Sequence, residues 1–446
     1  NFTSAWSGCT ALTSFLATGL DSGTSFEAAW YGCTALTSFP AIPLTAGTNF
    51  TLAWWTCSSM TSFLATGLDS GTLFPSAWQN CNSLATFPAI PLTAGENFSY
   101  AWYQCSSLTS FLATGLDSGT NFIGTWQQCT ALATFPAIPL TAGTLFENTW
   151  YGCTSLDSFL ATGLDSGTTF ASAWESCTSL ATMPAIALTA GTNFTAAWYN
   201  CTSMTSFLAT GLDSGTNFTN AWRSCTSLAT MPAIPLTDGI NFYGAWHSCT
   251  ALTSFLATGL DSGTSFSYTW YACGSLATMP AIPLTDGTNF QGAWQSCSSL
   301  SSFLATGLYS GTNFNYTWSG CTSLTSFPAI PLTAGTDFTA AWNQCTSLSS
   351  FLATGLDSGT NFTYAWLNCT SLATFPANVF DSWSPASVSV NCFLEAWGGC
   401  TALSATSVEN ILNSLATAAV VAPASGNDIT IDYNASSGTP SVASAV

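Results

Sequence analysis

A tryptophan recurs at 24-residue intervals from Trp6 to Trp366, and a cysteine follows each one three positions later, from Cys9 to Cys369. A strict period of this length is typical of a solenoid, in which each unit packs on its neighbours. The length of 446 residues would otherwise suggest about two or three ordinary domains. Because a solenoid grows by adding units, we predict that residues 1–376 form one solenoid of sixteen 24-residue repeats.

The first half of each repeat has the pattern of a short helix. In the third repeat Phe50, Trp54 and Cys57 lie at i, i+4 and i+7, the spacing of one face of a helix of about two turns. The residue before the phenylalanine is Asn, Ser, Thr or Asp in fourteen of sixteen repeats, the preferred set of helix N-caps. The predicted helix N-caps include Asn49, Asn97, Asn121 and Asn193.

The second half of each repeat has the pattern of a short strand. The residue before Phe39 and its equivalents is Ser or Thr in all sixteen repeats, and a small polar side chain next to a large apolar one indicates a strand with one buried face. We expect parallel strands of successive units to form one long sheet, with the helices on its other side. Like side chains then stack in buried columns, about 4.8 Å apart from unit to unit. The predicted structural ladder includes Trp6, Trp30, Trp54, Trp78, Cys9, Cys33, Cys57, Cys81, Phe15, Phe39, Phe63 and Phe87.

The units alternate in sequence, which predicts a 48-residue super-period. Odd units continue with Leu-Ala-Thr-Gly-Leu-Asp (16–21) and even units with Pro-Ala-Ile-Pro (40–43). Because proline removes a ladder donor, each of these strands should stop at or near Pro40 and its equivalents. The alternating Leu/Pro column is either second-layer core or an exposed apolar stripe. A glycine closes every unit, from Gly23 to Gly359, which indicates a positive φ or a close backbone contact.

The repeat pattern breaks after Phe375. We expect residues 377–446 to form an irregular capping region with one degenerate repeat around Trp397, a helix over 407–415 and a strand over 428–432. Such a region would close the open end of the solenoid.

Eighteen cysteines raise the question of a disulfide framework. Sixteen of them occupy the single column, where parallel Cβ vectors about 4.8 Å apart fit a disulfide poorly. We therefore expect a ladder of buried free thiols that act as small apolar groups. Cys392 and Cys400 lie outside the strict period and are the better candidates for a disulfide.

Composition excludes several classes of partner. Apolar residues make up 47% of the chain, charged residues only 5%, and the net charge is −19 with a single Arg and a single His. Nucleic acid and anionic membrane surfaces are excluded as partners, because both are bound through Lys and Arg. No apolar run is long enough to insert into a membrane. The chain starts within a repeat and shows no signal peptide, so we expect a processed product or part of something longer.

No set of residues outside the repeat columns forms a catalytic constellation, so we predict no enzyme activity, no cofactor and no metal. Asp21 and its equivalents in alternate units offer oxygen ligands for Ca²⁺, but a separation of about 10 Å prevents two of them from sharing an ion. A role in turns is the favoured interpretation. Arg223 and His247 are interpreted as single solvent-facing substitutions.

Two further sets of residues leave alternatives open. Several N-x-Ser/Thr sequons coincide with predicted caps, whereas Asn200, Asn315 and Asn368 are candidate glycosylation sites outside the cap column. The positions beside each tryptophan are rich in Tyr, Trp and Gln, such as Tyr31 and Trp55. Exposed aromatics there form a binding surface, or they cover neighbouring helices.

The unit F-x-x-A-W-x-x-C-x-x-L-x-x-F-P resembles the BspA-type leucine-rich repeat. Phe26, Trp30, Cys33, Leu36 and Phe39 take the places of that family's aromatic, cysteine, leucine and strand residues. Trp replaces the usual Phe, and Phe replaces the usual Ile. The resemblance covers about residues 1–376. It implies an α/β solenoid of leucine-rich-repeat-like units and a non-catalytic protein that is surface-located, secreted or phage-associated.

Near-identical units and scarce charge favour a non-catalytic extracellular structural protein that forms a fibre, an appendage or a virion-associated filament. A surface with so few charges is poorly soluble as a monomer, so we predict self-association, end to end or lateral. The alternative is an adhesin or receptor-binding module with a cell-surface ligand, displayed on a cell or phage surface. The sequence leaves both functions open.

Overall fold

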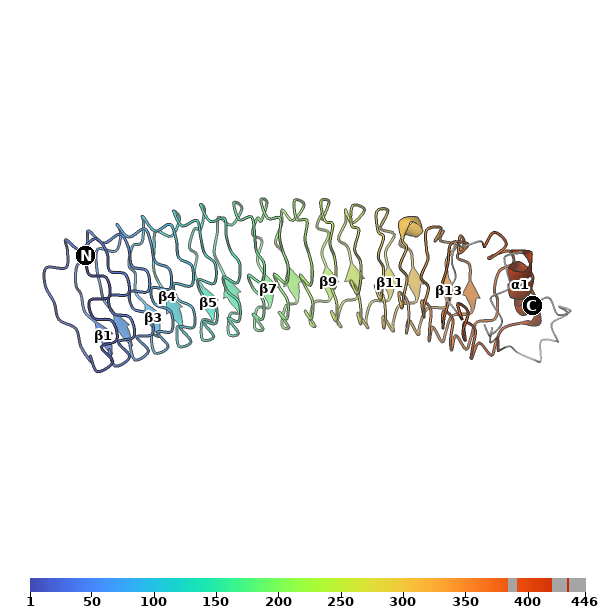
Figure 1. Cartoon of the computed structure of the whole chain (residues 1–446), viewed down its shortest axis with the longest axis horizontal. Helices are drawn as coiled ribbons and strands as arrows, with labels where there is room; N and C mark the ends of the chain where they lie inside the picture. Colours follow the sequence, from blue (N-terminus) through green and yellow to red (C-terminus); the bar gives the residue numbers. More distant parts are fainter. Residues whose placement is uncertain (384–390, 419–430, 433–446) are drawn as a thin grey trace. The chain divides into compact units, whose positions relative to one another are not determined.

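The computed structural model describes residues 1–383, 391–418 and 431–432. The chain divides into two compact units, residues 1–216 with 224–227, and residues 217–223 with 228–446. In each unit the chain coils with the 24-residue period of the sequence, and each coil forms a rung that stacks on the next (Figure 1). Each unit is therefore a β-solenoid, as the sequence period predicts.

The strands are two residues long and end on the inward-facing Phe or Met. They pair in parallel and are offset by one repeat, so that Ser38 lies opposite Ser62 and Phe39 opposite Phe63. The first unit contains Ser38–Phe39 (β1), Ser62–Phe63 (β2), Thr86–Phe87 (β3), Ser110–Phe111 (β4), Thr134–Phe135 (β5), Ser158–Phe159 (β6), Thr182–Met183 (β7) and Ser206–Phe207 (β8). The second contains Thr230–Met231 (β9), Ser254–Phe255 (β10), Thr278–Met279 (β11), Ser302–Phe303 (β12), the 3₁₀ turn Leu308–Ser310 (η1), Ser326–Phe327 (β13) and Ser350–Phe351 (β14).

Proline explains why the strands pair two by two and do not form the expected long sheet. The amide of Leu64 donates to the carbonyl oxygen of Phe39 over 2.9 Å, which joins β2 to β1. The equivalent donor on the next rung would be residue 88, a proline without an N–H. The prediction of one continuous sheet is therefore wrong, whereas β1 does stop directly before Pro40.

Residues 50–57 form two consecutive turns instead of the predicted helix. Leu52 and Thr56 have φ values of +56° and +55°, a left-handed conformation that an α-helix does not contain. Their amides donate to backbone oxygens of the next rung over 2.9 and 2.8 Å. Each turn spans four positions, so Phe50 and Trp54 are both buried and imitate the spacing of a helix face. The prediction of a helix in every repeat is therefore wrong.

The asparagines predicted as helix N-caps instead close Asx turns. Asn49 Oδ1 accepts a hydrogen bond from the amide of Thr51 over 2.9 Å. The same bond to the amide two positions on is made by Asn97, Asn121 and Asn193, at 3.0, 3.0 and 3.1 Å. Leucine replaces the asparagine in two rungs. After Leu73, residue 75 is a proline, which has no amide to satisfy, whereas Leu145 is followed by Glu147.

The interior of each unit consists of stacked side-chain columns. The ring centroids of Trp30 and Trp54 lie 5.4 Å apart with planes at 3°, and those of Phe26 and Phe50 lie 5.5 Å apart. Phe39 packs edge-on against both indoles, with centroid distances of 4.7 and 5.2 Å. All five side chains are fully buried. Because each rung adds the same set of rings, the core extends by repetition within each unit.

The indole N–H groups of Trp54, Trp78 and Trp102 have no hydrogen-bond partner among the described residues. A buried donor without a partner costs about 1–3 kcal/mol. An indole that buries roughly 200 Å² at about 25 cal/mol per Å² contributes about 5 kcal/mol. Burial of the ring therefore outweighs the orphaned donor in each rung.

The cysteine column is a ladder of thiols that donate to backbone. Cys57 Sγ donates to the carbonyl oxygen of Trp30 over 3.3 Å, and Cys81 Sγ makes the same contact to Trp54. All cysteines are free, including Cys392 and Cys400, so the expectation of a disulfide between those two is wrong. Both are buried, and Cys400 continues the column by donating to Trp366.

The glycine that closes each rung keeps an ordinary φ. A Cβ atom added to Gly119 would lie 2.5 Å from Phe122 Cζ and 3.0 Å from the ring of Phe98. The sequence suggested either a positive φ or a close contact at this glycine. The close contact is the correct explanation, and it is made with aromatic rings. Positive φ occurs four positions earlier in odd units, as at Gly115 (+71°).

The second unit ends in a further rung and a helix (Figure 1). The indole of Trp397 stacks on that of Trp366 at 5.2 Å. Helix α1 (Ala405–Thr417) begins after the N-cap Ser404 and contains the predicted helix at 407–415. Its Ser407 hydroxyl donates to the carbonyl oxygen of Ala373 over 2.9 Å, which ties the helix to the last strand-like segment.

The predicted strand at 428–432 lies mostly outside the described residues. Within the part that is described, Ile431 forms a parallel bridge with Trp397. No helix among the described residues is long and apolar enough to cross a membrane.

Candidate binding site

The residue directly after each tryptophan and the one that follows it form two columns, here called the outer columns. Tyr31 and Trp55, from the first outer column, stack with ring centroids 4.5 Å apart and are half-buried. The aromatic rings therefore cover one another and still face solvent. The sequence left open whether these aromatic side chains form a binding surface or cover neighbouring parts of the chain, and each interpretation describes part of this arrangement.

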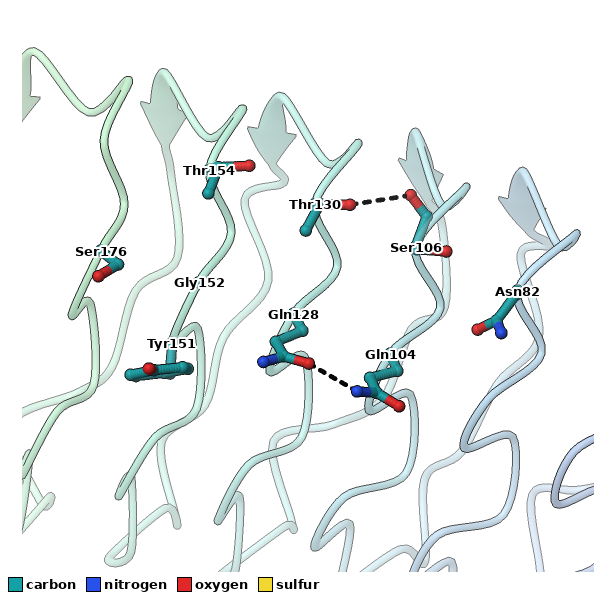
Figure 2. Close-up of a pocket in the computed structure, with 9 residues that line it drawn as sticks. All are labelled: Asn82, Gln104, Ser106, Gln128, Thr130, Tyr151, Gly152, Thr154 and Ser176. Carbon is teal, nitrogen blue, oxygen red and sulfur yellow. Dashed lines mark hydrogen bonds between the residues drawn. The ribbon is translucent and has the colours of Figure 1, made fainter.

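A first groove follows the outer columns of the first unit and has a volume of about 490 Å³ (Figure 2). Figure 2 shows Gln104 Nε2 donating to Gln128 Oε1 over 2.7 Å, and the Thr130 hydroxyl donating to the Ser106 carbonyl oxygen over 3.3 Å. Gly152 stands where a glutamine stands one rung earlier. The lining is Asn82, Gln104, Ser106, Gln128, Thr130, Tyr151, Gly152, Thr154 and Ser176.

The chemistry of this first groove is that of neutral amides and hydroxyls. Its lining contains no carboxylate, no basic side chain and no thiol. Such groups donate and accept hydrogen bonds, and hydroxyls without an adjacent base to activate them are weak nucleophiles. The groove is suited to hold a neutral polar molecule.

A second groove, of about 530 Å³, follows the outer columns of the second unit. Its first outer column contains, in consecutive rungs, Arg223, His247, Tyr271 and Gln295. His247 and Tyr271 stack with ring centroids 4.5 Å apart. Arg223 and His247 are the only Arg and the only His of the whole sequence. Arg223 and His247, interpreted from the sequence as single solvent-facing substitutions, are half-buried and line one groove together.

Three tyrosines surround the second groove. Tyr268 contacts Tyr243 and Tyr271 edge to face, at centroid distances of 5.9 and 6.0 Å. Its hydroxyl accepts a hydrogen bond from Gln291 Nε2 over 2.9 Å. A Cβ atom on Gly292 would lie 2.6 Å from the Tyr268 ring, so glycine at 292 allows the ring to lie across the next rung.

The electrostatics of the second groove depend on one cation. Burial, and next the charge of Arg223, lower the pKa of His247 to about 4, so the imidazole is neutral at physiological pH. Burial is also the first cause that raises the pKa of Tyr268, followed by its tyrosine neighbours. The guanidinium of Arg223 donates to Asn220 Oδ1 over 3.4 Å.

The interior thiols offer no nucleophile. Burial raises the pKa of Cys33 to about 11 and that of Cys105 to about 12, and it also raises that of Cys129 well above its ordinary value. The thiolate is the reactive form of cysteine, so these groups are inert at neutral pH. Cys9 is exposed, unlike the other cysteines.

The candidate glycosylation sites differ in exposure. Asn368 is exposed, whereas Asn200 and Asn315 are half-buried, and Asn200 Nδ2 donates to the Ser176 hydroxyl over 3.3 Å. Residues of the aspartate column such as Asp21 and Asp69 are exposed. No group of three or more potential metal ligands occurs in the described part of the chain.

No protein-family model matches the chain, and no curated protein matches its sequence. Solved structures with a similar fold include a leucine-rich repeat protein from Bacteroides ovatus, at 17% identity and a TM-score of 0.46, covering 85% of this chain and 81% of that one. A leucine-rich cell surface protein from Faecalibacterium prausnitzii is similar at 18% identity and a TM-score of 0.36, covering 72% and 79%.

A third similar structure is the functional domain of InlJ from Listeria monocytogenes, which is described as including a cysteine ladder. It is 12% identical with a TM-score of 0.25, and the match covers 74% of this chain and 70% of that one. At these identities and TM-scores, no ligand or activity transfers from any of the three to this chain.

Proposed function

We propose that this chain is a non-catalytic, extracellular structural protein of the leucine-rich-repeat kind, which builds a fibre, an appendage or a virion-associated filament by lateral association of copies. The observation that carries the proposal is a stripe of half-exposed leucines. The stripe has a 48-residue spacing, the two-rung unit of the sequence.

The leucine stripe lies directly after the inward-facing Phe of odd rungs. In the first unit it consists of Leu16, which is 90% exposed in the first rung, and of Leu64, Leu112, Leu160 and Leu208, each 49–50% exposed. In the second unit it consists of Leu256, Leu304 and Leu352, each 48–50% exposed. Half-buried prolines occupy the same position in the rungs between them, so the stripe is apolar throughout. Of the two interpretations of the alternating Leu/Pro column, second-layer core or exposed apolar stripe, the leucines therefore follow the second.

The occupant that fits this stripe is a second copy of the chain. Leucines two rungs apart are separated by about 10 Å. A partner that presents apolar groups at that spacing over several repeats is another copy, laid side by side. The column two positions before each Phe consists mainly of Thr and Ala, with Asp157 as the acid among them, so the net charge of −19 is largely carried elsewhere.

Energetics favour association that uses many leucines at once. Completing the burial of a half-exposed leucine contributes about 1 kcal/mol. One contact is too weak to hold two chains, whereas a row of contacts adds up along the stripe. The acidic net charge opposes association at long range, and salt screens this repulsion.

Light scattering on the full chain tests the proposal. We expect reversible association that grows with protein concentration and with salt. Leu112→Ser, Leu160→Ser and Leu208→Ser combined should leave monomers, whereas Thr61→Ser, Thr109→Ser and Thr205→Ser on the same face should associate like the wild type. A wild-type chain that stays monomeric at high salt overturns the proposal, as does a leucine variant that associates unchanged.

An extracellular location is supported by two features of the chain. A single Arg and no Lys leave almost nothing for trypsin-like proteases to cut. Burial keeps the interior thiols protonated, so they are protected from oxidation where disulfides otherwise form. Trypsin treatment of the native chain should leave it intact or cut it once, after Arg223.

The two grooves favour a second candidate function, an adhesin or receptor-binding module. They are local departures from a repeat that is otherwise uniform, and both lie on the outer columns. Display on a surface and ligand binding through a groove would not exclude lateral association through the leucine stripe.

A further inference from the structure

The second groove collects the rarest side chains of the protein. The sequence contains one Arg and one His against 20 acids, and these two lie one repeat apart, on consecutive rungs of one column. The next two residues of the column, Tyr271 and Gln295, line the same groove. A ligand that contacts one of these side chains can therefore contact the others.

The groove is ordered before any ligand arrives. The His247 ring is stacked on Tyr271, and its Nδ1 lies 2.8 Å from the Ser248 hydroxyl. Glycines on alternate rungs leave the space that larger side chains use: a Cβ atom on Gly244 would lie 2.5 Å from Asn220 Oδ1. Binding to a groove of fixed side chains loses less conformational entropy than binding to mobile ones.

The side chains define what fits. Tyr243, which is 39% exposed, offers an aromatic ring together with a hydroxyl. Such rings pack against the C–H faces of sugar rings, while hydroxyl and amide groups such as Gln295 bond to sugar hydroxyls. The Arg223 guanidinium presents a planar fork of donors that matches a carboxylate.

The geometry points to an acidic oligosaccharide as the ligand of the second groove, with one carboxylate on Arg223 and its sugar rings on the tyrosines. A polyanion is a poorer fit, because the net charge of −19 repels every additional negative group. The neutral state of His247 makes the imidazole a hydrogen-bonding group there and leaves Arg223 as the charge that selects the ligand.

The first groove serves as the internal control for this inference. It follows the same outer columns and has a similar volume, about 490 Å³ against about 530 Å³. It contains one tyrosine and no cation. If charge selects the ligand, only changes in the second groove alter binding of an acidic sugar.

Titration calorimetry on the full chain tests the assignment with two probes, a glucuronic-acid-terminated oligosaccharide and its glucose-terminated counterpart. We expect the acidic probe to bind at least about tenfold more tightly, a difference of about 1.4 kcal/mol. Arg223→Gln should remove this preference, and Tyr243→Ser should weaken both probes. Gln104→Ala and Gln128→Ala, at the first groove, should change neither affinity.

Several results would overturn the assignment. They are equal affinities for the two probes, no binding of the acidic probe, an Arg223→Gln variant that keeps the preference, and tighter binding of a short peptide through its C-terminal carboxylate. Urea midpoints equal to that of the wild type show that each variant is folded. The leucine variants test lateral association only. Their result does not change the interpretation of this binding experiment.

Discussion

The tryptophan column and the first outer column are neighbours in the chain and opposites in character. Trp126 and Gln127 are joined by one peptide bond, and both belong to columns that recur once per repeat. Trp126 is fully buried between two other indoles, at centroid distances of 5.7 and 5.8 Å. Gln127 is half-buried, and the equivalent positions carry Tyr, Trp, Glu, Arg and His. One step along the chain thus separates a position fixed by stacking from a position open to variation.

The difference shows how this chain separates stability from recognition. An interior side chain must match the same side chain in the rungs before and after it, so a change in one rung disturbs three. An outer side chain meets solvent on one side, and a change there alters the surface while the backbone ladder between rungs stays intact. A structural repeat can therefore acquire a binding groove without loss of its core.

The buried columns were predictable because their cause is the period itself. One period shared by Trp and Cys requires that successive rungs place them in register, and the structure places Trp54 on Trp30 and Phe63 on Phe39 in stacked pairs. The two turns that replace the predicted helix were not predictable from spacing alone. A four-residue turn and a helix of about 3.6 residues per turn both place Phe50 and Trp54 on one side. Only the positive φ at Leu52 separates the two.

The second groove was missed for a different reason. Arg223 and His247 each look like an isolated change when they are compared only with the other residues of their column. Their separation, which equals the repeat length itself, was the signal that they lie on consecutive rungs. The contribution of Tyr243 and Tyr268 was not predictable, since it depends on the turn geometry and on the space left at Gly244 and Gly292.

The largest difference between interior and outer columns should appear at alkaline pH. Burial raises the pKa of the Cys105 and Cys153 thiols from their ordinary value of 9.0 to about 12. Above pH 9 the unfolded chain therefore loses protons that the folded chain keeps. Each such thiol lowers the free energy of unfolding by about 1.4 kcal/mol per pH unit. We expect the urea midpoint to be level up to about pH 8.5 and to fall steeply above it.

Two controls belong to the alkaline experiment. Replacing Cys105 and Cys129 by Ala should make the fall with pH shallower, although it lowers stability at neutral pH. A thiol reagent at neutral pH should modify Cys9 alone in the native chain, because the other cysteines are buried. A urea midpoint that stays level to pH 10.5 would show that the thiols are accessible in the folded state.

The next largest effect should come from the adjacent pair Trp126 and Gln127. Trp126→Ala removes an indole from the middle of a stack and leaves a cavity, which costs about 3–5 kcal/mol of unfolding free energy. Gln127→Ala should cost less than about 0.5 kcal/mol, as surface changes usually do. Urea unfolding monitored by circular dichroism measures both. Similar costs for the two variants would contradict the division between interior and outer columns.

A smaller effect is expected for two glycines, one against the interior rings and one in an outer column. Gly119→Ala places a methyl group between the rings of Phe98 and Phe122 and should cost about 1–3 kcal/mol by overpacking. Gly152 lies in the second outer column, and the methyl group of Gly152→Ala would meet only Gln128, whose Cγ is 3.4 Å away. The substitution should lower the free energy of unfolding by about 1 kcal/mol, because alanine is disfavoured at the left-handed φ of +70°. Thermal unfolding of the two variants ranks them, and a more damaging change at Gly152 would refute the ring-contact explanation of the closing glycine.

The smallest predicted effects lie in the asparagine column, directly before the buried phenylalanines, where the Asx turns begin. Asn97→Ala leaves the amide of Ser99 without its side-chain acceptor and should cost about 1 kcal/mol. Leu73→Asn introduces the same acceptor two positions before Pro75, which has no N–H, and should gain nothing. Leu73→Asn could instead stabilise the chain as much as Asn97→Ala destabilises it. The hydrogen bond to the amide two positions later would then not explain why asparagine is preferred at this position.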